Sequence, residues 1–310
     1  MMRANDAMWK PIGVRDEVCE LEVSCSCTAA ELALSLLSSK AAVARVFARG
    51  QLQRGGEVLQ RSDCLDVGQV LILTFHHPDA PPKAGSGTVD VVYRDRILLA
   101  VDKPADLLVH GDGTASSTLT SRVQGLLADD GLSVVAQPVQ RLDVETTGLV
   151  LFSLTEEFQP VLDAQVAGHE MRKRYLAVID GRIPCGEDAW LELDGPIARD
   201  RHDARKMRVG RGGKPSRTFV RMLASSGSRT LLEIELATGR KHQIRVHLAH
   251  AGHPLVGDVL YGGRRGSNGL MLHAWKERVR HPLTGEWLEL QTAIPERFAR
   301  LFPELGDSQL

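Results

Sequence analysis

Residues 137–152 read QPVQRLDVETTGLVLF, and this stretch says more about fold and function than any other. A charged pair, Arg141 and Asp143, and a hydroxyl pair, Thr146 and Thr147, precede an apolar run that is typical of a buried strand. Such a strand is usually entered through small turn residues, so the charges and hydroxyls indicate a functional loop. The alternative is a plain turn, in which Asp143 accepts hydrogen bonds from one of the two threonines.

The rest of the chain after residue 88 is typical of one α+β domain. β-Branched and aliphatic runs predict strands at residues 89–93, 97–102, 149–153, 175–180, 217–223 and 231–236. Helical patterns cover residues 118–127, 155–166 and 241–251. The second would open with Thr155 as its cap and Glu156 and Glu157 in its first turn, and the third would stop at Gly252. Strands with helices beside them predict an α+β fold with a mixed, mainly antiparallel sheet.

The first quarter of the chain is predicted to form a separate small unit. Residues 29–37 and 41–49 are rich in Ala and Leu and indicate two short helices, and alternation over 67–75 indicates a strand. A cluster of Pro and Gly follows and is typical of a linker. We expect an N-terminal extension at 1–17, a small α+β unit at 18–75, a linker at 76–88 and a larger domain at 89–310.

Composition places the chain among ordinary globular proteins, with 43% hydrophobic and 25% charged residues in 310. No apolar run approaches the roughly 18 residues of a membrane span, and residues 1–10 lack the apolar core of a secretory signal. The five cysteines form no metal-ligand pattern, which favours free thiols in a reducing compartment. We therefore expect a cytoplasmic protein without a membrane partner.

A formal net charge of −1 conceals a strongly basic segment at residues 199–221, with nine Lys or Arg against two acids. Such a block can follow a phosphate backbone while acids elsewhere cancel its charge. It can also be a solvated loop around the glycines at 210–213. The candidate phosphate-binding residues of this block are Arg199, Arg205, Lys206 and Arg208.

Three segments together resemble the RluA-type pseudouridine synthases. The Arg-Leu-Asp loop at 141–143 resembles their signature, and residues 173–177, KRYLA, match their Tyr-containing strand. Residues 238–262, TGRKHQIRVHLAHAGHPLVGDVLYG, match their long His-Gln-Ile-Arg block. The resemblance covers about residues 88–300 and implies the pseudouridine synthase fold. It also implies isomerisation of uridine in RNA, in which the N1–C1′ bond breaks and the base rejoins through C5, without a metal or redox cofactor.

The resemblance also implies the roles of individual residues. Asp143 is the catalytic carboxylate, which attacks C1′ or removes the 2′ proton. Arg245 pairs with it and fixes its orientation, and helical periodicity would project Arg245 away from the core toward the site. Tyr175 stacks on the base and assists at C5. Arg141 fills the gap of the flipped uridine or grips a phosphate. The further RNA-binding candidates are Thr147, Arg240, His242 and Gln243.

The sequence departs from the family pattern at three positions. Gln140 stands where His is most frequent, Thr147 replaces a usual Ser, and Asp106 replaces a Gly. Gln keeps its hydrogen-bonding groups and Thr its hydroxyl, so the chemistry should survive these changes. We expect any difference to concern RNA handling near Arg141.

The small unit at 18–75 resembles an S4-type RNA-binding module, with its basic helix thinned to Lys40, Arg45 and Arg49. A chain with such a module ahead of the larger domain resembles the family members that act on large ribosomal RNA, whereas shorter relatives without it often act on tRNA or on mixed targets. The partner that we expect is therefore ribosomal RNA, with tRNA as the alternative and no DNA. We expect the enzyme to be a monomer.

Two hypotheses of other classes remain. Four histidines between residues 242 and 253 would fit a metal-dependent hydrolase, but no His-Glu-x-x-His pattern or second carboxylate-rich segment accompanies them. The other hypothesis is a non-catalytic RNA-binding protein on the synthase fold. The presence of Asp143, Tyr175 and Arg245 together argues against it.

Overall fold

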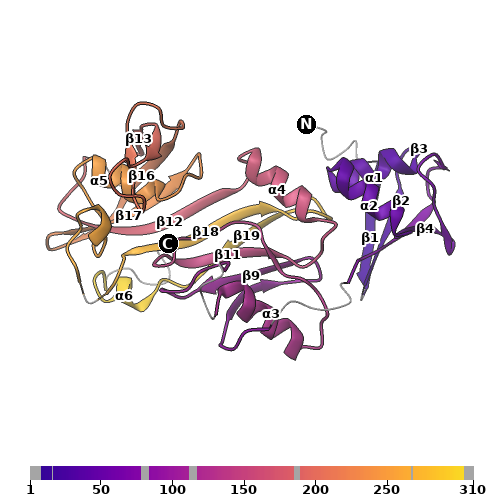
Figure 1. Ribbon diagram of the computed structural model, residues 1–310, viewed down its shortest axis with the longest axis horizontal. Coiled ribbons are helices and arrows are strands. Elements are labelled where there is room, and N and C mark those ends of the chain that lie inside the picture. Colours follow the sequence, from indigo (N-terminus) through magenta and orange to yellow (C-terminus); the bar gives the residue numbers. More distant parts are fainter. Residues whose placement is uncertain are drawn as a thin grey trace.

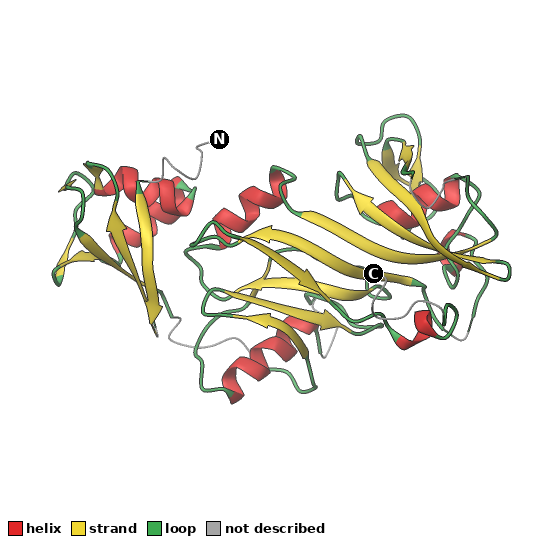
Figure 2. Ribbon diagram, turned by 180° about the vertical axis from the view of Figure 1, so that it is seen from behind, coloured by secondary structure: helices red, strands yellow, loops and turns green. Residues whose placement is uncertain are grey.

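The computed structural model describes residues 8–15, 17–77, 84–111, 117–184, 189–266 and 268–303. These residues form a small N-terminal unit and a larger domain, which lie end to end along the longest axis of the molecule (Figures 1 and 2). Both units combine helices with mainly antiparallel sheet, so the predicted fold class is confirmed. No helix of the described part is long and apolar enough to cross a membrane.

The larger domain is built on a sheet whose ten strands are all in the described residues. They are β8 (Asp90–Arg94), β9 (Leu98–Lys103), β10 (Gln137–Pro138), β11 (Thr147–Ser153), β12 (Arg172–Asp180), β13 (Leu191–Asp194), β16 (Arg217–Ser226), β17 (Arg229–Leu236), β18 (Leu272–Arg280) and β19 (Trp287–Gln291). The order is β13-β16-β17-β12-β18-β11-β9-β8, with β10 beside β11 and β19 beside β18. All six predicted strands are present, and β11 and β18 form a parallel pair.

The remaining elements of this domain flank the sheet. They are β14 (Ile197–Arg199), β15 (Met207–Val209), α3 (Leu119–Asp129), α4 (Gln159–Ala167), α5 (Gln243–His250), the 3₁₀ helix η1 (Val259–Tyr261) and α6 (Glu296–Ala299). Helices α3 and α4 lie on opposite sides of the sheet (Figure 1). In β9, Leu98 and Ala100 pack in the core of α4, whereas Leu99 and Val101 pack in the core of α3. Because both faces are covered, residues 98–101 of the strand are all apolar and do not alternate with polar residues.

Helix α4 begins later than predicted. Its first residue is Gln159, and its cap position, Phe158, makes no side-chain cap hydrogen bond. Pro160 lies in the first turn, where its fixed φ suits a helix and its missing N–H costs nothing. The prediction of a Thr155 cap was therefore wrong, and the acids expected in the first turn precede the helix.

The small unit contains two helices and seven short strands within the described residues. They are β1 (Trp9–Arg15), β2 (Val18–Val23), β3 (Cys27–Thr28), α1 (Ala29–Leu37), α2 (Lys40–Ala48), β4 (Leu52–Arg54), β5 (Glu57–Val58), β6 (Cys64–Leu65) and β7 (Val70–Thr74). Both predicted helices and the last strand are confirmed. The expected start at residue 18 is too late, because β1 pairs with β2 along its length.

Two sequence predictions fall partly outside the described residues. The expected linker at 76–88 includes residues 78–83, and Cys185 is one of the five cysteines. The other four, Cys19, Cys25, Cys27 and Cys64, are free thiols.

A buried carboxylate attaches the small unit to the larger domain. Glu157 Oε1 accepts hydrogen bonds from Gln51 Nε2 at 2.6 Å and from the His76 backbone N–H at 3.0 Å. Beside it, the ring of Phe75 packs edge-on against Phe158 with 6.1 Å between centroids. One continuous apolar cluster includes residues of both units. The two units therefore share a core at this junction.

The same junction engages the basic helix α2. Arg45 Nε lies 2.6 Å from one carboxylate oxygen of Glu156, and Arg49 Nη1 lies 3.0 Å from the other. Two of the three cations of this helix therefore face the larger domain. They are less available to a phosphate backbone than the sequence alone indicates.

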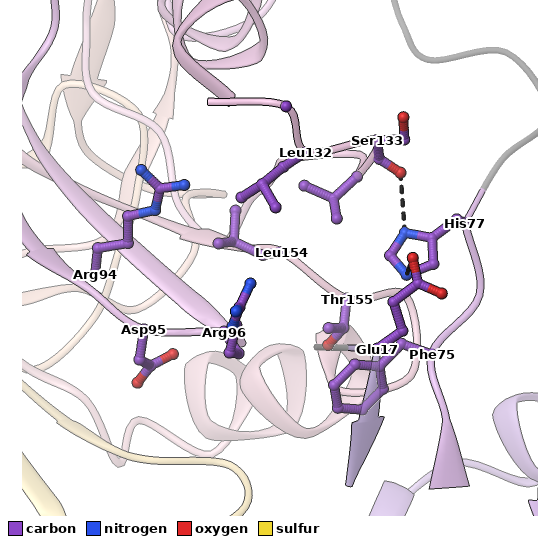
Figure 3. A pocket seen from close by; sticks show the side chains of 12 residues that line it. Glu17, Phe75, His77, Arg94, Asp95, Arg96, Leu132, Ser133, Leu154 and Thr155 are labelled. Carbon is purple, nitrogen blue, oxygen red and sulfur yellow. Dashed lines mark hydrogen bonds and ion pairs between the residues drawn. The ribbon is translucent and has the colours of Figure 1, made fainter. Parts of the chain in front are cut away.

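A cavity of about 660 Å³ lies beside the junction (Figure 3). It is lined by Glu17, Phe75, His77, Arg94, Asp95, Arg96, Gly131, Leu132, Ser133, Val134, Leu154 and Thr155. None of the residues expected to act in catalysis is among them. Helix α5, which carries Arg245, lies at the far end of the large sheet from the small unit (Figures 1 and 2).

The attachment through Glu157 predicts a stability effect. Glu157→Ala leaves one N–H of the Gln51 amide, whose other N–H donates to the Thr74 oxygen, and the His76 N–H without a partner, which should lower the free energy of unfolding by about 1 to 3 kcal/mol. Asp163→Asn on the exposed side of α4, where the carboxylate contacts only Gln159, should change it by less than about 0.5 kcal/mol. Urea unfolding followed by circular dichroism measures both. Equal midpoints for the two variants would contradict the attachment.

Candidate active site

The loop that carries Asp143 is placed by the start of β11. Gly148 has φ +112°, and a Cβ there would lie 2.1 Å from the Ala274 carbonyl oxygen of β18. Only glycine lets the two strands approach this closely. The loop is closed from within by the Thr146 N–H, which donates to the Asp143 backbone oxygen at 3.1 Å. The Thr-Gly step therefore anchors the loop to the middle of the sheet.

Lys103 holds the backbone of this loop, a role that was not predicted from the sequence. Its side chain is fully buried, and Nζ donates to the backbone oxygens of Pro104, Leu107 and Val144 at 2.8 to 2.9 Å. Burial lowers the pKa of this ammonium group to about 8. The bond to Val144 fixes the backbone next to Asp143. In sequence, a lysine at the end of a strand indicates an exposed side chain, so only the structure reveals this role.

Arg245 lies in the interior, with an exposed fraction of 2%. Its Nε and Nη2 donate to the two carboxylate oxygens of Asp258 at 2.8 and 2.7 Å, and Nη2 lies 3.1 Å from Glu145. Its Nη1 lies 3.6 Å from Asp143 Oδ2. Burial alone would lower the pKa of Arg245, but the Asp258 hydrogen bonds and the other acids raise it. Arg245 is therefore buried, but it points away from the apolar cluster of Ile244 and Leu248 and toward Asp143, as expected.

Asp143 combines this partner with access to solvent. Its side chain is 28% exposed, and the same Oδ2 atom that faces Arg245 lies 3.7 Å from His242 Nε2. In the described residues neither Thr146 nor Thr147 donates its hydroxyl to this carboxylate. The arrangement supports a functional carboxylate and not a plain turn.

Tyr175 lies on β12 in the apolar core next to β18 and is 8% exposed. Burial raises the pKa of its phenol, and the negative charges of Glu277 and Asp143 raise it further. Leu142, which precedes Asp143, packs against the same apolar cluster as Tyr175. Within the described residues the Tyr175 hydroxyl makes no hydrogen bond, either to a backbone carbonyl or to a side chain.

Thr147 belongs to a buried chain of hydrogen bonds and not to an RNA-binding surface. Its hydroxyl accepts from Arg297 Nη2 at 2.7 Å and contacts His273 Nδ1 at 2.8 Å. His273 Nε2 in turn contacts the Thr292 hydroxyl at 2.7 Å. Burial lowers the pKa of His273 to about 3, which keeps the ring neutral. The prediction that Thr147 contacts RNA was wrong, because the hydroxyl ties β11 to β18.

Gln243 is likewise structural. It is 3% exposed, and its amide oxygen accepts from the Thr238 hydroxyl at 2.8 Å and from the Arg240 N–H at 3.1 Å. Its amide nitrogen donates to the Arg217 backbone oxygen at 2.9 Å. The side chain therefore organises the turn before α5 and does not face RNA. Arg240 is half-buried, and its Nε lies 3.4 Å from the Pro215 oxygen.

His242 belongs to the site itself. It caps α5 in a left-handed backbone conformation with φ 56°, which directs its ring toward Asp143. Its Nδ1 lies 2.8 Å from the Tyr261 hydroxyl, and the guanidinium of Arg245 lies 5.4 Å from the centre of the Tyr261 ring. Tyr261 and Asp258 were not assigned from sequence. Their signal was present in the Gly-Asp and Tyr-Gly steps of the long downstream block.

The basic segment lies beside this site. The Met207 N–H of β15 donates to the Tyr261 hydroxyl at 2.8 Å, which ties the β14–β15 hairpin to the residues around Asp143. Arg199 and Arg205 are exposed on this hairpin and Lys206 and Arg208 are half-exposed. Arg205 donates to both carboxylate oxygens of Asp203, at 3.0 and 2.8 Å, so its charge is partly compensated.

The two residues before Leu142 differ in their surroundings. Arg141, an RNA-binding candidate, is exposed next to Asp143. Gln140, at the position where His is most frequent in the family, donates from Nε2 to the buried Glu277 at 2.6 Å. The histidines between residues 242 and 253 do not point to a common metal site. His247 Nδ1 contacts the Thr218 hydroxyl, and His250 is exposed. No group of three His, Cys, Asp or Glu in the described part of the chain could hold a metal ion.

Comparisons with known proteins agree with this geometry. The sequence profile described as RNA pseudouridylate synthase matches residues 97–250, which include Asp143, Tyr175 and Arg245. The chain is 33% identical over 263 residues to the "Uncharacterized RNA pseudouridine synthase YlyB" of Bacillus subtilis, covering 83% of this chain and 86% of the relative. It is 34% identical over 276 residues to the "Ribosomal large subunit pseudouridine synthase D" of Xanthomonas campestris, covering 83% and 80%.

The fold is similar to a solved structure of the same kind. "Human RNA Pseudouridylate Synthase Domain Containing 1" matches with a TM-score of 0.56 and 27% identity, over 69% of this chain and 87% of the human one. Sequence and fold thus agree over most of the chain. The protein belongs to the RNA pseudouridine synthase family, whose members are isomerases.

Proposed function

We propose that this enzyme converts uridine to pseudouridine in ribosomal RNA and that Asp143 is its catalytic carboxylate. One observation carries the assignment: Asp143 is a partly exposed carboxylate that faces a fully paired, buried guanidinium at 3.6 Å. The guanidinium of Arg245 faces one oxygen of this carboxylate and restricts its orientation. The reaction needs an oriented, ionised carboxylate that the ribose can reach.

The chemistry follows from this placement. Asp143 either attacks C1′ as a nucleophile or removes the 2′ proton on the way to a glycal, and in both routes the N1–C1′ bond breaks. The detached uracil must then turn so that C5 faces C1′. The ring of Tyr175, in the apolar cluster against which Leu142 packs, supports stacking on the base during this rotation. All of these steps occur within one nucleotide, so no second substrate is needed.

The site itself has an excess of negative charge, because the carboxylates of Asp143, Glu145 and Asp258 surround the single guanidinium of Arg245. Binding of the RNA phosphates therefore needs further positive charge nearby. A uridine in folded RNA is paired or stacked and must be flipped out before Asp143 can reach it. The hairpin cations Arg199, Lys206 and Arg208 lie beside the site, where they would hold the distorted backbone. Arg141, exposed next to Asp143, would occupy the gap that the base leaves.

The choice of ribosomal RNA is supported by the names of the relatives. Those of Xanthomonas campestris and Yersinia pestis, 34% and 35% identical, are both named as pseudouridine synthases of the large ribosomal subunit. Others, from Bacillus subtilis and Chloroflexus aurantiacus, are named only as RNA pseudouridine synthases. The resemblance of the small unit to an S4 module favours the same target. Its RNA contacts would have to come from surfaces other than the Arg45 and Arg49 side of α2.

Asp143→Asn should abolish the modification and leave RNA binding within about threefold, because an amide keeps the shape but is neither nucleophile nor base. The measurement is pseudouridine mapping of total RNA from cells that lack the gene and carry a plasmid copy. The wild-type chain should restore a site in large-subunit rRNA, and Asp143→Asn should not. The exposed Asp163→Asn variant is the matched control and should restore it. Restoration by Asp143→Asn would refute the catalytic assignment, and a site confined to tRNA would refute the ribosomal one.

Neutralising Arg205, Lys206 and Arg208 to Gln together should raise KM for RNA and flatten the salt dependence of binding. The slope of log K against log salt should fall by about 0.7 to 0.9 for each phosphate that the variant no longer binds. Arg205 should contribute least, because Asp203 already pairs with it. The matched control changes three cations that lie beside surface carboxylates elsewhere, namely Lys10, Arg229 and Arg300. Equal slopes for the two triple variants would show that the hairpin is only a solvated loop.

A further inference from the structure

Tyr261 connects the β14–β15 hairpin with His242, which faces Asp143. Its hydroxyl oxygen accepts the Met207 backbone N–H at 2.8 Å and lies 2.8 Å from Nδ1 of His242. The two rings meet edge to face, with 5.7 Å between their centroids and an angle of 89°. On the other side of the imidazole, Nε2 lies 3.7 Å from Asp143 Oδ2. The hydroxyl therefore contacts a ring whose opposite nitrogen faces the reacting group.

The number of protons decides which nitrogen of His242 is protonated. A phenol has one proton, and a neutral imidazole has one N–H. If Nδ1 held the imidazole proton, the Tyr261 oxygen would accept two N–H groups, and its own proton would have no acceptor in the described residues. The lone pair of Nε2 would then face the negative charge of Asp143. If the phenol donates to Nδ1 instead, the N–H lies at Nε2 and faces the carboxylate.

Building on the proposed function, we propose that Tyr261 is a positioning residue. It holds His242 as the tautomer protonated at Nε2, so that this N–H and Arg245 both direct their positive ends to Oδ2 of Asp143. His242 and Arg245 both approach the carboxylate at this one oxygen. The other oxygen, Oδ1, is left for the ribose. Tyr261 acts only through His242 and contacts no reacting atom.

The charges around the ring are consistent with a neutral His242. Burial lowers the pKa of His242, and Arg245 and Lys241 lower it further, against the opposing effects of Asp143 and Asp258. Burial also raises the pKa of the Tyr261 phenol, which keeps its proton available for Nδ1. At 3.7 Å the N–H of His242 orients the carboxylate electrostatically, and catalytic contacts of this kind commonly shorten when substrate binds.

The first test is the tautomer of His242 in the full-length enzyme labelled with ¹⁵N in its histidine rings. Long-range ¹H–¹⁵N spectra distinguish a protonated from an unprotonated ring nitrogen, and the His242→Gln spectrum identifies the signals of His242. The wild-type enzyme should show a protonated Nε2 and an unprotonated Nδ1. Tyr261→Phe keeps the aromatic ring and should shift both signals toward a mixture of tautomers. Tyr93→Phe, which removes a hydroxyl bonded to Asp95 at the junction, should leave them unchanged.

The second readout is kinetic. Loss of one hydrogen bond should reduce kcat of Tyr261→Phe by about three- to tenfold with KM within about twofold. The phenol stabilises neutral His242, so its removal raises the pKa of His242. Protonated His242 would pair with Asp143, and the acidic limb of the kcat profile should move to higher pH. Tyr93→Phe should keep the wild-type profile.

Two results would overturn the proposal: an unprotonated Nε2 in the wild-type enzyme, or a Tyr261→Phe variant with the wild-type tautomer and pH profile. Because the spectra need no RNA turnover, they decide the tautomer even if Asp143→Asn proves active.

Discussion

The buried ion pair between Arg245 and Asp258 is the constraint on which the site depends. A guanidinium with an exposed fraction of 2% is costly to bury, and only a carboxylate with two well-aligned oxygens, together with further acids, makes the position tolerable. The pair holds α5 against the turn that precedes η1. It also leaves one nitrogen, Nη1, directed at Asp143. Orientation of Asp143, the proposed catalytic carboxylate, is thus a consequence of how an interior charge is compensated.

The sheet brings the two halves of this arrangement together. Asp143 directly precedes β11, which forms a parallel pair with β18, and Arg245 lies on α5 with its Nη1 3.6 Å from Asp143 Oδ2. Gly148 permits the close approach of these strands, and Lys103 and the Thr147–His273 contact fix the loop and the strand start. Each of these supports is buried. The loop that carries Asp143 is therefore held by buried contacts, which restrict its movement, as catalysis by precise orientation requires.

The parts that sequence predicts well are those with a local physical signal. Six strands of the large sheet follow from β-branched and aliphatic runs and most helices from periodicity, but β18, which anchors the Asp143 loop, was not predicted. The Asp143 loop stands out because charges and hydroxyls precede a buried strand. The errors arise where tertiary contacts override the local pattern. Thr147 and Gln243 are polar residues inside functional motifs, and only their burial shows that their side chains make hydrogen bonds within the protein. Glu156 and Glu157 have the sequence positions of first-turn acids, but their side-chain partners Arg49 and Gln51 are in the small unit, more than a hundred positions away.

Sequence also could not place Asp258 or Tyr261, because their roles depend on ring and guanidinium geometry around Asp143. The most direct measurement of whether the buried pair orients Asp143, the proposed catalytic carboxylate, is the turnover of Asp258→Asn on RNA from cells that lack the gene. The amide keeps the size of the side chain but removes the charge that fixes Arg245. We expect kcat to fall by at least about tenfold, equivalent to about 1.4 kcal/mol, with the Kd for RNA within about threefold. A folded Asp258→Asn enzyme with the wild-type kcat would contradict the dependence of Asp143 on this ion pair.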